Sequence, residues 1–152
     1  MYGHMLKAKQ KNPARIVIVE DNPADVFLLR HGLDQHGEGY VLETLEDGEE
    51  AIRFVEKQHF APPEPEPCVI VLDLHLPKHD GPAVLKALRS EPSLAHVQVV
   101  ALSTLAAPQD EMQVRNLGVR LYRTKPTDLD DWISLAGQIL EICRERDAPV
   151  MV

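Results

Sequence analysis

One short segment, CVIVL at residues 68–72, restricts the fold of this chain more than any other feature of its sequence. Every position is apolar, so a strand formed here has no face suited to water. Such a strand must be covered on both sides, which is the situation of a strand inside a parallel sheet. The run stops at a carboxylate, Asp73. The segment therefore predicts a buried parallel strand with a charged residue at its carboxyl end.

The rest of the chain alternates between short apolar segments and segments with helical spacing. Apolar and β-branched runs predict strands at residues 15–20, 40–45, 68–72, 97–102 and 119–122. Helical spacing and helix-starting pairs such as Asn22-Pro23 predict a helix after each strand, the last three at 82–90, 109–117 and 128–146. Five strand–helix units predict an α/β fold, a three-layer sandwich with helices on both faces of an open parallel sheet.

Length and composition fit one domain with a sizeable core, because the chain has 152 residues of which 44% are hydrophobic. We assign residues 14–147 to this domain, residues 1–13 to a disordered or tag-like start, and residues 148–152 to a short tail. The proline-rich segment APPEPEP at 61–67 is interpreted as an extended loop and not as a linker between domains. Neither side of this segment has enough strands to form a core of its own.

Charge and the lack of certain segments argue against several partners. A net charge of −8 disfavours binding to the phosphate backbone of nucleic acids. No apolar run approaches the roughly 20 residues of a membrane helix, and the first twelve residues lack the apolar core of a signal peptide. Cys68 and Cys143 are far apart in the sequence, so we expect no disulfide and a reducing, cytoplasmic location.

Charged and hydroxyl side chains gather at the predicted carboxyl ends of four strands. In an open α/β sheet, ligands bind beyond this edge. The first strand ends at Glu20 and Asp21, and the third ends at Asp73. Ser103 ends the fourth strand and Lys125 follows the fifth. We therefore expect three carboxylates, a hydroxyl and an ammonium group to converge on one site.

These groups suit phosphoryl chemistry around a hard divalent cation. Neighbouring carboxylates repel one another, and Mg²⁺, which prefers oxygen ligands, relieves that repulsion. Asp73 is then the nucleophile that forms an acyl phosphate, while Lys125 and Ser103 contact phosphoryl oxygens. Taken singly, Asp21 fits a turn or cap residue, Lys125 a solvated loop lysine and Ser103 a structural residue. Their joint placement at four strand ends favours the site.

Four segments resemble signatures of the receiver domain of bacterial two-component response regulators, and the resemblance covers about residues 15–146. The segments are VEDNPAD (19–25), VLDLHLPKHDG (71–81), ALST (101–104) and YRTKP (122–126). The resemblance implies a flavodoxin-like sheet in the order 2-1-3-4-5. The DNPAD opening, the loop at 61–67 and KPTDLDDW are similar to the phytochrome-associated group of single-domain regulators, which implies a phytochrome-type sensor histidine kinase as the partner.

The resemblance also implies a role for each matching residue. Asp73 is the phosphoacceptor, and Ser103 and Lys125 contact the phosphoryl group. Tyr122 is the aromatic switch, which turns inward when Ser103 moves toward the phosphoryl group, as a population shift between two packings. The implied ligands of Mg²⁺ are the side chains of Glu20, Asp21 and Asp73 and the backbone carbonyl of His75.

Two positions near Asp73 depart from the family's pattern. Thr104 stands where a small residue is usual, and Leu105 stands where many members have a polar one. Together with His75 they flank the access to Asp73, so we expect these residues to set the lifetime of the phosphorylated state. His75 and His79 are otherwise interpreted as ordinary loop histidines, because no second metal ligand lies at a suitable spacing.

Only residues 147–152 follow the last predicted helix, so we expect no output domain and an output through protein contacts. Apolar residues cover about half the circumference of that helix, more than the ~100° of a typical surface helix. This favours a homodimer through the fourth helix, fifth strand and fifth helix, a surface that the resemblance also implies. A deeply packed helix is the alternative. A diffusible effector and a phosphate shuttle or sink in a phosphorelay both stay open.

Three other classes of protein fit the sequence less well. A Mg²⁺-dependent phosphatase of the haloacid dehalogenase type needs a second aspartate where this chain has His75. A dinucleotide or flavin protein needs a G-x-G-x-x-G after the first strand, which this sequence lacks. A receiver that works without phosphorylation would have lost an acidic residue or the lysine. We therefore predict a phosphoacceptor signalling protein that is no enzyme beyond catalysing its own phosphorylation and dephosphorylation.

Overall fold

The computed structural model describes residues 13–61, 66–104 and 108–146. Within these residues, five parallel strands form one sheet in the order β2-β1-β3-β4-β5, which confirms the flavodoxin-like fold. The strands are β1 (Ala14–Val19), β2 (Tyr40–Leu45), β3 (Val69–Asp73), β4 (Gln98–Ser103) and β5 (Leu121–Thr124). The helices are α2 (Pro23–Asp34), α3 (Gly48–Phe60), α4 (Gly81–Ser90), α5 (Pro108–Asn116) and α6 (Leu129–Arg146). The expectations for residues 1–12, 62–65, 147–152 and Leu105 lie outside the described residues.

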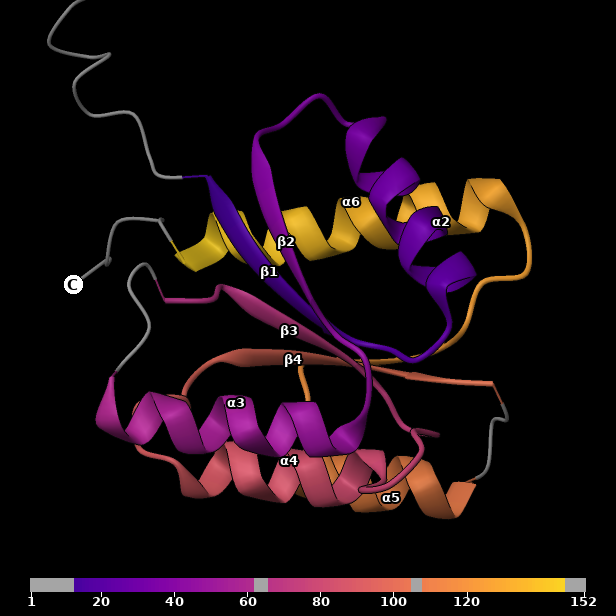
Figure 1. Cartoon of the computed structure of the whole chain (residues 1–152). Helices are drawn as coiled ribbons and strands as arrows, with labels where there is room; N and C mark the ends of the chain where they lie inside the picture. Colours follow the sequence, from indigo (N-terminus) through magenta and orange to yellow (C-terminus); the bar gives the residue numbers. More distant parts are fainter. Residues whose placement is uncertain (1–12, 62–65, 105–107, 147–152) are drawn as a thin grey trace, which may run out of the picture.

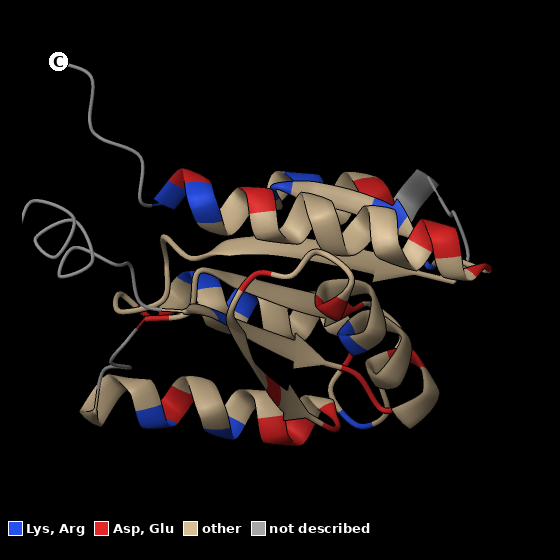
Figure 2. Ribbon diagram, turned by 90° about the horizontal axis from the view of Figure 1, so that it is seen from above, with Lys and Arg blue, Asp and Glu red and all other residues tan. Residues whose placement is uncertain are grey.

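The described helices form two layers around the sheet (Figure 1). Helices α2 and α6 pack on one face, and α3, α4 and α5 pack on the other. Along β3, Val69 and Val71 belong to the core under α2 and α6, whereas Ile70 and Leu72 belong to the core under the other three helices. Both faces of β3 are therefore covered, which explains its uninterrupted apolar run. The segments coloured as charged residues lie mainly on the helices and connecting loops (Figure 2).

The third and fourth strands end at the residues expected from the sequence, whereas the fifth strand lies later in the chain than predicted. Asp73 and Ser103 are the last residues of β3 and β4, each paired with the neighbouring strand. The predicted strand at 119–122 was displaced by two residues, because pairing with β4 begins at Leu121. Val119 follows the turn at Gly118, which has a φ of 76°, and packs against the core. Its apolar character therefore reflects a packed turn and not a strand.

The loop that follows Asp73 is held against the start of α3. Gly48 approaches this loop so closely that a Cβ atom would lie 1.9 Å from the carbonyl oxygen of His79. Lys78 has a left-handed backbone conformation, with a φ of 67°, and its ammonium lies 3.4 Å from a carboxylate oxygen of Asp47. A larger residue at position 48 would push the loop outward. These contacts hold the path of the chain directly after Asp73.

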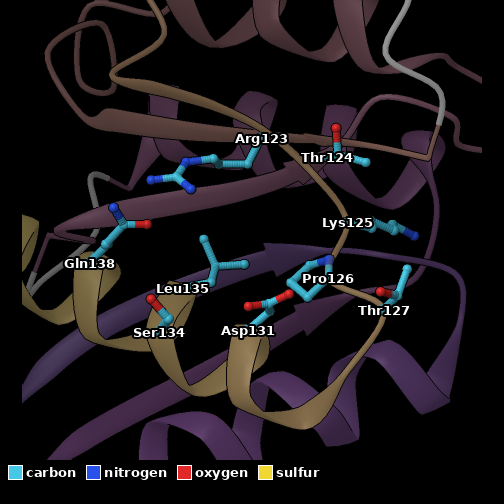
Figure 3. A pocket seen from close by; sticks show the side chains of 9 residues that line it. All are labelled: Arg123, Thr124, Lys125, Pro126, Thr127, Asp131, Ser134, Leu135 and Gln138. Carbon is cyan, nitrogen blue, oxygen red and sulfur yellow. The ribbon is translucent and has the colours of Figure 1, made fainter.

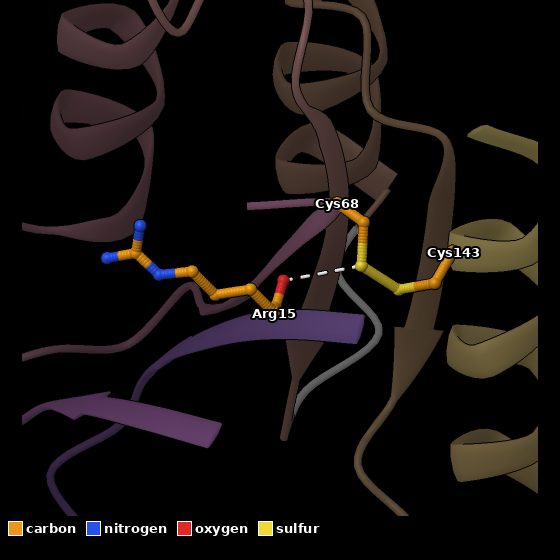
Figure 4. Close-up of a disulfide and its surroundings, with 3 residues drawn as sticks. All are labelled: Arg15, Cys68 and Cys143. Atoms are coloured by element: carbon orange, nitrogen blue, oxygen red, sulfur yellow. Dashed lines mark hydrogen bonds between the residues drawn. A yellow bond between two sulfur atoms is a disulfide. The ribbon is translucent and has the colours of Figure 1, made fainter. Parts of the chain in front are cut away.

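A disulfide joins Cys68, just before β3, to Cys143 in α6 (Figure 4). The expectation of two unpaired cysteines was therefore wrong. The two residues are 75 positions apart in the sequence, but the packing of α6 on the sheet brings their Cα atoms to 5.1 Å. The Sγ atom of Cys68 also lies 3.3 Å from the carbonyl oxygen of Arg15, in the neighbouring strand. The cysteines thus give no support for a reducing compartment.

The apolar residues of α6 are used inside the domain. The wide apolar arc expected for the last helix includes Leu135, Ile139 and Ile142, and all three are buried against α2 and the sheet. The deeply packed helix, and not a dimer interface, accounts for the arc. Neither α6 nor any other helix in the described part of the chain is long and apolar enough to cross a membrane.

Candidate functional site

Three carboxylates meet at the carboxyl edge of the sheet. Glu20 and Asp21 follow β1, and Asp73 ends β3, which is the neighbour of β1. Each of the three offers a carboxylate oxygen, and these oxygens all lie within 4.8 Å of one another. Glu20 and Asp73 are buried, whereas Asp21 is exposed. Adjacent parallel strands end side by side, so the sheet itself assembles this acidic cluster.

The ammonium group of Lys125 reaches the same cluster from the segment after β5. Its Nζ atom lies 2.7 Å from Glu20, 2.8 Å from Asp25 and 3.2 Å from Asp73. Sequence analysis missed Asp25. It lies four residues after Asp21, in the first turn of α2. That spacing returns a helical side chain to the strand end from which the helix started, and it is the signal that would have found Asp25.

Burial and charge strongly affect ionisation at this cluster. Burial, reinforced by the neighbouring Asp73, raises the pKa of Glu20 from its ordinary 4.5 to about 8, despite the opposing effect of Lys125. Burial alone would lower the pKa of Lys125, but hydrogen bonds and charges from Asp25, Glu20 and Asp73 outweigh it and raise that pKa. The lysine is therefore firmly cationic, while the carboxyl group of Glu20 retains a proton near neutral pH because its pKa is raised.

The two oxygens of Asp73 have different partners. Oδ1 accepts a hydrogen bond from the backbone N–H of His75 at 2.9 Å, and Oδ2 accepts one from Lys125 at 3.2 Å. The backbone bond comes from the loop that Gly48 and Lys78 hold in place. The carboxylate is therefore oriented, with one oxygen directed to the backbone and the other toward the ammonium group.

Ser103 and His75 form an unexpected contact beside the cluster. Ser103 is fully buried at the end of β4, and its Oγ lies 3.1 Å from Nε2 of His75. Its carbonyl oxygen accepts a hydrogen bond from the backbone N–H of Lys125 at 2.8 Å, which joins the ends of β4 and β5. His75 is an exposed loop residue, and the contact of its ring with the serine hydroxyl was not predicted from the sequence. Thr104, the next residue, is exposed.

Tyr122 lies on β5, paired with Ala101 of β4. The ring packs against the core under α3, α4 and α5. Its hydroxyl is buried, and among the described residues it has no hydrogen-bond partner. An unpaired buried hydroxyl is unfavourable by about 1–3 kcal/mol, so this inward position of the ring carries a cost.

A cavity of about 340 Å³ lies between β5 and the first half of α6 (Figure 3). In this view Lys125 extends away from the helix residues that line the cavity, such as Leu135 and Gln138. The carboxylates Glu20 and Asp73 do not line it. The cavity is therefore separate from the acidic cluster, although the segment 123–127 borders both.

The donor atoms of the acidic cluster are of the kind that binds a divalent cation. Its three side chains supply only oxygen ligands, and hard cations such as Mg²⁺ prefer such ligands. Without a cation, the free-energy cost of burying the carboxyl groups of Glu20 and Asp73 is offset by the charge of Lys125 and by the proton that Glu20 retains. A bound cation would remove the need for that proton. The donor set thus fits a hard divalent metal.

A five-stranded open α/β sheet with this cluster of acids, lysine and buried serine at its carboxyl edge is the architecture of a receiver-type signalling domain. The family model described as the response regulator receiver domain matches residues 16–136. The chain belongs to this family of response regulators. The matched range includes β1 from its third residue, the other four strands and every residue of the cluster.

Relatives support the same assignment over most of the chain. Response regulator Rcp1 of Synechocystis sp. is 35% identical over 131 residues, which are 86% of this chain and 89% of that protein. A crystal structure of its Mn²⁺-bound form has a TM-score of 0.73 and covers 84% of this chain and 91% of that one. The phosphorylated cyanobacterial phytochrome response regulator RcpA is 31% identical, has a TM-score of 0.78 and covers 93% of this chain and 100% of its own. The bacteriophytochrome response regulator AtBRR is 29% identical, with a TM-score of 0.68 over 93% of this chain and 99% of its own.

Proposed function

We propose that Asp73 accepts a phosphoryl group from a sensor histidine kinase, and that this modification changes the protein contacts of the domain. The observation that carries the proposal is the environment of the Asp73 carboxylate. It is buried at a strand end, oriented by a backbone N–H, and lies 3.2 Å from the ammonium of Lys125. Glu20 and Asp21 stand beside it with oxygens suited to a metal.

In the transfer step, an oxygen of Asp73 attacks phosphorus while the bond from phosphorus to the kinase histidine breaks. We assign the attack to Oδ2, because the backbone N–H of His75 holds Oδ1, whereas the side chain of Lys125 can move its donor from Oδ2 to a phosphoryl oxygen. Lys125 then donates to a phosphoryl oxygen, and Ser103 donates to another. Positioning and charge neutralisation are the main requirements of such a transfer, and these side chains provide both.

Mg²⁺ is the metal of this proposal. Its ligands would be the side chains of Glu20, Asp21 and Asp73 and the backbone carbonyl of His75. The oxygen-only donor set supports a hard cation of this kind. When bound, the ion supplies charge neutralisation for the carboxylates and the phosphoryl oxygens.

The output would be transmitted by Ser103 and Tyr122. The hydroxyl of Ser103 lies 3.1 Å from Nε2 of His75, and we expect it to shift toward the phosphoryl oxygen to which it donates. Tyr122 lies on the strand beside β4, so movement at Ser103 alters the space available to its ring. Repacking of this tyrosine would change the surface of β5, and a partner would bind one packing better than the other. A phosphate shuttle or sink in a relay is the second candidate, and it needs no such switch.

We propose a phytochrome-type histidine kinase as the partner, and the cytoplasm as the place where the two proteins meet. We also propose that residues 14–147 form the domain that is sufficient for this interaction. Support comes from the similarity to RcpA and AtBRR, which are phytochrome response regulators. We propose no enzymatic activity on other substrates. The phosphatase alternative needs an aspartate at position 75, where this chain has a histidine whose ring contacts Ser103.

A homodimer through α5, β5 and α6 is proposed from the family resemblance alone, since the apolar arc of α6 is buried within the domain. Met112 on α5 and Leu129 at the start of α6 are exposed large apolar side chains on these elements. Sedimentation of the phosphorylated and unphosphorylated chain tests the assembly. A monomer in both states at concentrations on the order of tens of micromolar would exclude it.

Incubation with Mg²⁺ and acetyl phosphate tests the function without knowledge of the kinase. We expect the wild-type chain to take up one phosphoryl group and the Asp73→Asn variant to take up none. Removing the metal with a chelator should abolish uptake by the wild type. Equal uptake by the variant would overturn the assignment of Asp73.

A further inference from the structure

We propose that Asp25 is a positioning residue of the phosphoacceptor site, which holds the ammonium group of Lys125 in place from the first turn of α2. The inference rests on the proposed function of Asp73 and Lys125 and adds a residue to it. Asp25 is outside the acidic cluster that fits a cation, because that cluster consists of Glu20, Asp21 and Asp73.

The geometry of the contact is specific. An oxygen of Asp25 lies 2.8 Å from Nζ of Lys125, and the two side chains are only 17% and 11% exposed. Asn22 caps α2 by accepting a hydrogen bond from the N–H of Ala24, which fixes where the helix starts and hence where Asp25 is placed. The contact joins two segments 100 positions apart in the sequence.

Asp25 differs from the other partners of Lys125 in what happens during the reaction. An ammonium group has three N–H donors. The ammonium group of Lys125 lies within ion-pair distance of three carboxylates, those of Glu20, Asp25 and Asp73. Phosphorylation converts Asp73 into an acyl phosphate, and a metal ion competes for Glu20. Asp25 is neither esterified nor part of the cation cluster, so it is the partner that Lys125 keeps throughout.

Retaining one anionic partner limits where the ammonium can go. Lys125 has a long side chain with several rotatable bonds, and an ammonium group is strongly hydrated in water. With Asp25 in place, one donor is tethered to α2 and the others are directed toward Asp73. Without it, the lysine side chain gains access to solvent, and its donor is at the phosphoryl position for a smaller fraction of the time.

Replacing Asp25 by asparagine tests this role, because the amide keeps the size and removes the charge. Asp130→Asn is the matched control, since Asp130 is an exposed carboxylate in the first turn of α6. We expect Asp25→Asn to lower the initial rate of phosphorylation by acetyl phosphate about tenfold, with Asp130→Asn unchanged. Asp25→Glu should restore part of the rate. The affinity for Mg²⁺ should change by less than about twofold, because Asp25 is no ligand.

A second measurement needs neither metal nor phosphorylation. In the metal-free chain, labelling of lysine amines by an acetylating reagent reports how often the ammonium of Lys125 reaches solvent. Peptide mass spectrometry should find Lys125 labelled about fivefold faster in Asp25→Asn than in the wild type, with Lys86 as the internal reference. An unchanged labelling rate at Lys125 would overturn the proposal even if the proposed function of Asp73 holds.

A double-substitution cycle decides whether Asp25 acts through Lys125. In a Lys125→Gln background, Asp25→Asn should cause no further loss of phosphorylation rate. The same tenfold loss in that background would show that Asp25 acts independently and would overturn the proposal. A parallel fall of Mg²⁺ affinity and rate in Asp25→Asn would also overturn it, because Asp25 would then belong to the metal site. If the wild type takes up no phosphoryl group at all, the proposed function fails, and the labelling result still judges the Asp25–Lys125 contact.

Discussion

Metal binding should release a proton from the acidic cluster, and the structure sets the size of this effect. Burial raises the pKa of Glu20 to about 8, so below that pH the cluster holds a proton in the metal-free chain. A cation requires the carboxylate form, and the proton must leave when it binds.

The magnitude follows from the position of this pKa. With a pKa of about 8, roughly 0.9 proton is released per Mg²⁺ at pH 7 and roughly 0.1 at pH 9. The apparent affinity should therefore rise about 50-fold between pH 6 and pH 8 and then level off. With the ordinary value of 4.5, the affinity would change by less than about 10% over the same range.

Titration calorimetry in two buffers with different ionisation enthalpies measures the released protons directly. The Glu20→Gln variant is the control, and we expect it to bind Mg²⁺ more weakly with almost no proton release at any pH. The same raised pKa also predicts how the free energy of unfolding changes with pH. Because the pKa of Glu20 is raised by folding, the metal-free domain should lose stability as the pH rises from about 4.5 through 8. Proton release near zero at pH 7 in the wild type would refute the reasoning.

Three further predictions concern stability. Tyr122→Phe should raise the free energy of unfolding by about 1 kcal/mol, because it removes a buried hydroxyl that has no partner among the described residues. Tyr40→Phe is the control and should not raise it, because the Tyr40 hydroxyl lies within hydrogen-bond distance of Arg30 and Asp34. A lower free energy of unfolding in Tyr122→Phe would contradict this. Arg89 donates hydrogen bonds to four backbone carbonyl oxygens among the described residues, so Arg89→Ala should cost roughly 3 kcal/mol in urea unfolding and the exposed Arg53→Ala less than about 0.5. Reducing the disulfide that spans 75 residues should lower the free energy of unfolding by about 4 kcal/mol in the wild type and have no effect on Cys143→Ser; equal unfolding with and without reductant would contradict the bond.

The fold and the acidic cluster were predictable because both follow from strand order. The apolar run before Asp73 specifies a central strand, and the ends of adjacent parallel strands must meet. Glu20, Asp21, Asp73 and Lys125 were therefore brought together by topology, which short-range sequence patterns predict well. The roles of these residues remain part of the proposal.

The errors came from contacts that depend on side-chain direction and on packing between distant segments. His75 was expected to flank Asp73 and to offer its backbone carbonyl, but the contact of its ring with Ser103 was not predicted. Cys68 and Cys143 meet only because α6 packs along the sheet. Asp25 was overlooked because a carboxylate in the first turn of a helix usually stabilises the helix dipole and has no other partner. The His75–Ser103 contact and the disulfide need three-dimensional distances that the sequence pattern does not contain.

Identification of the phosphorylated atom tests the central claim most directly. The chain would be phosphorylated with acetyl phosphate and Mg²⁺, and an acyl phosphate would then be trapped by reduction with borohydride, which converts a phosphorylated aspartate to homoserine. Peptide sequencing by mass spectrometry should find homoserine at position 73 and aspartate unchanged at position 21. Homoserine at any other position, or a phosphoryl group that survives on a serine, threonine or histidine while Asp73 stays unmodified, would contradict the account.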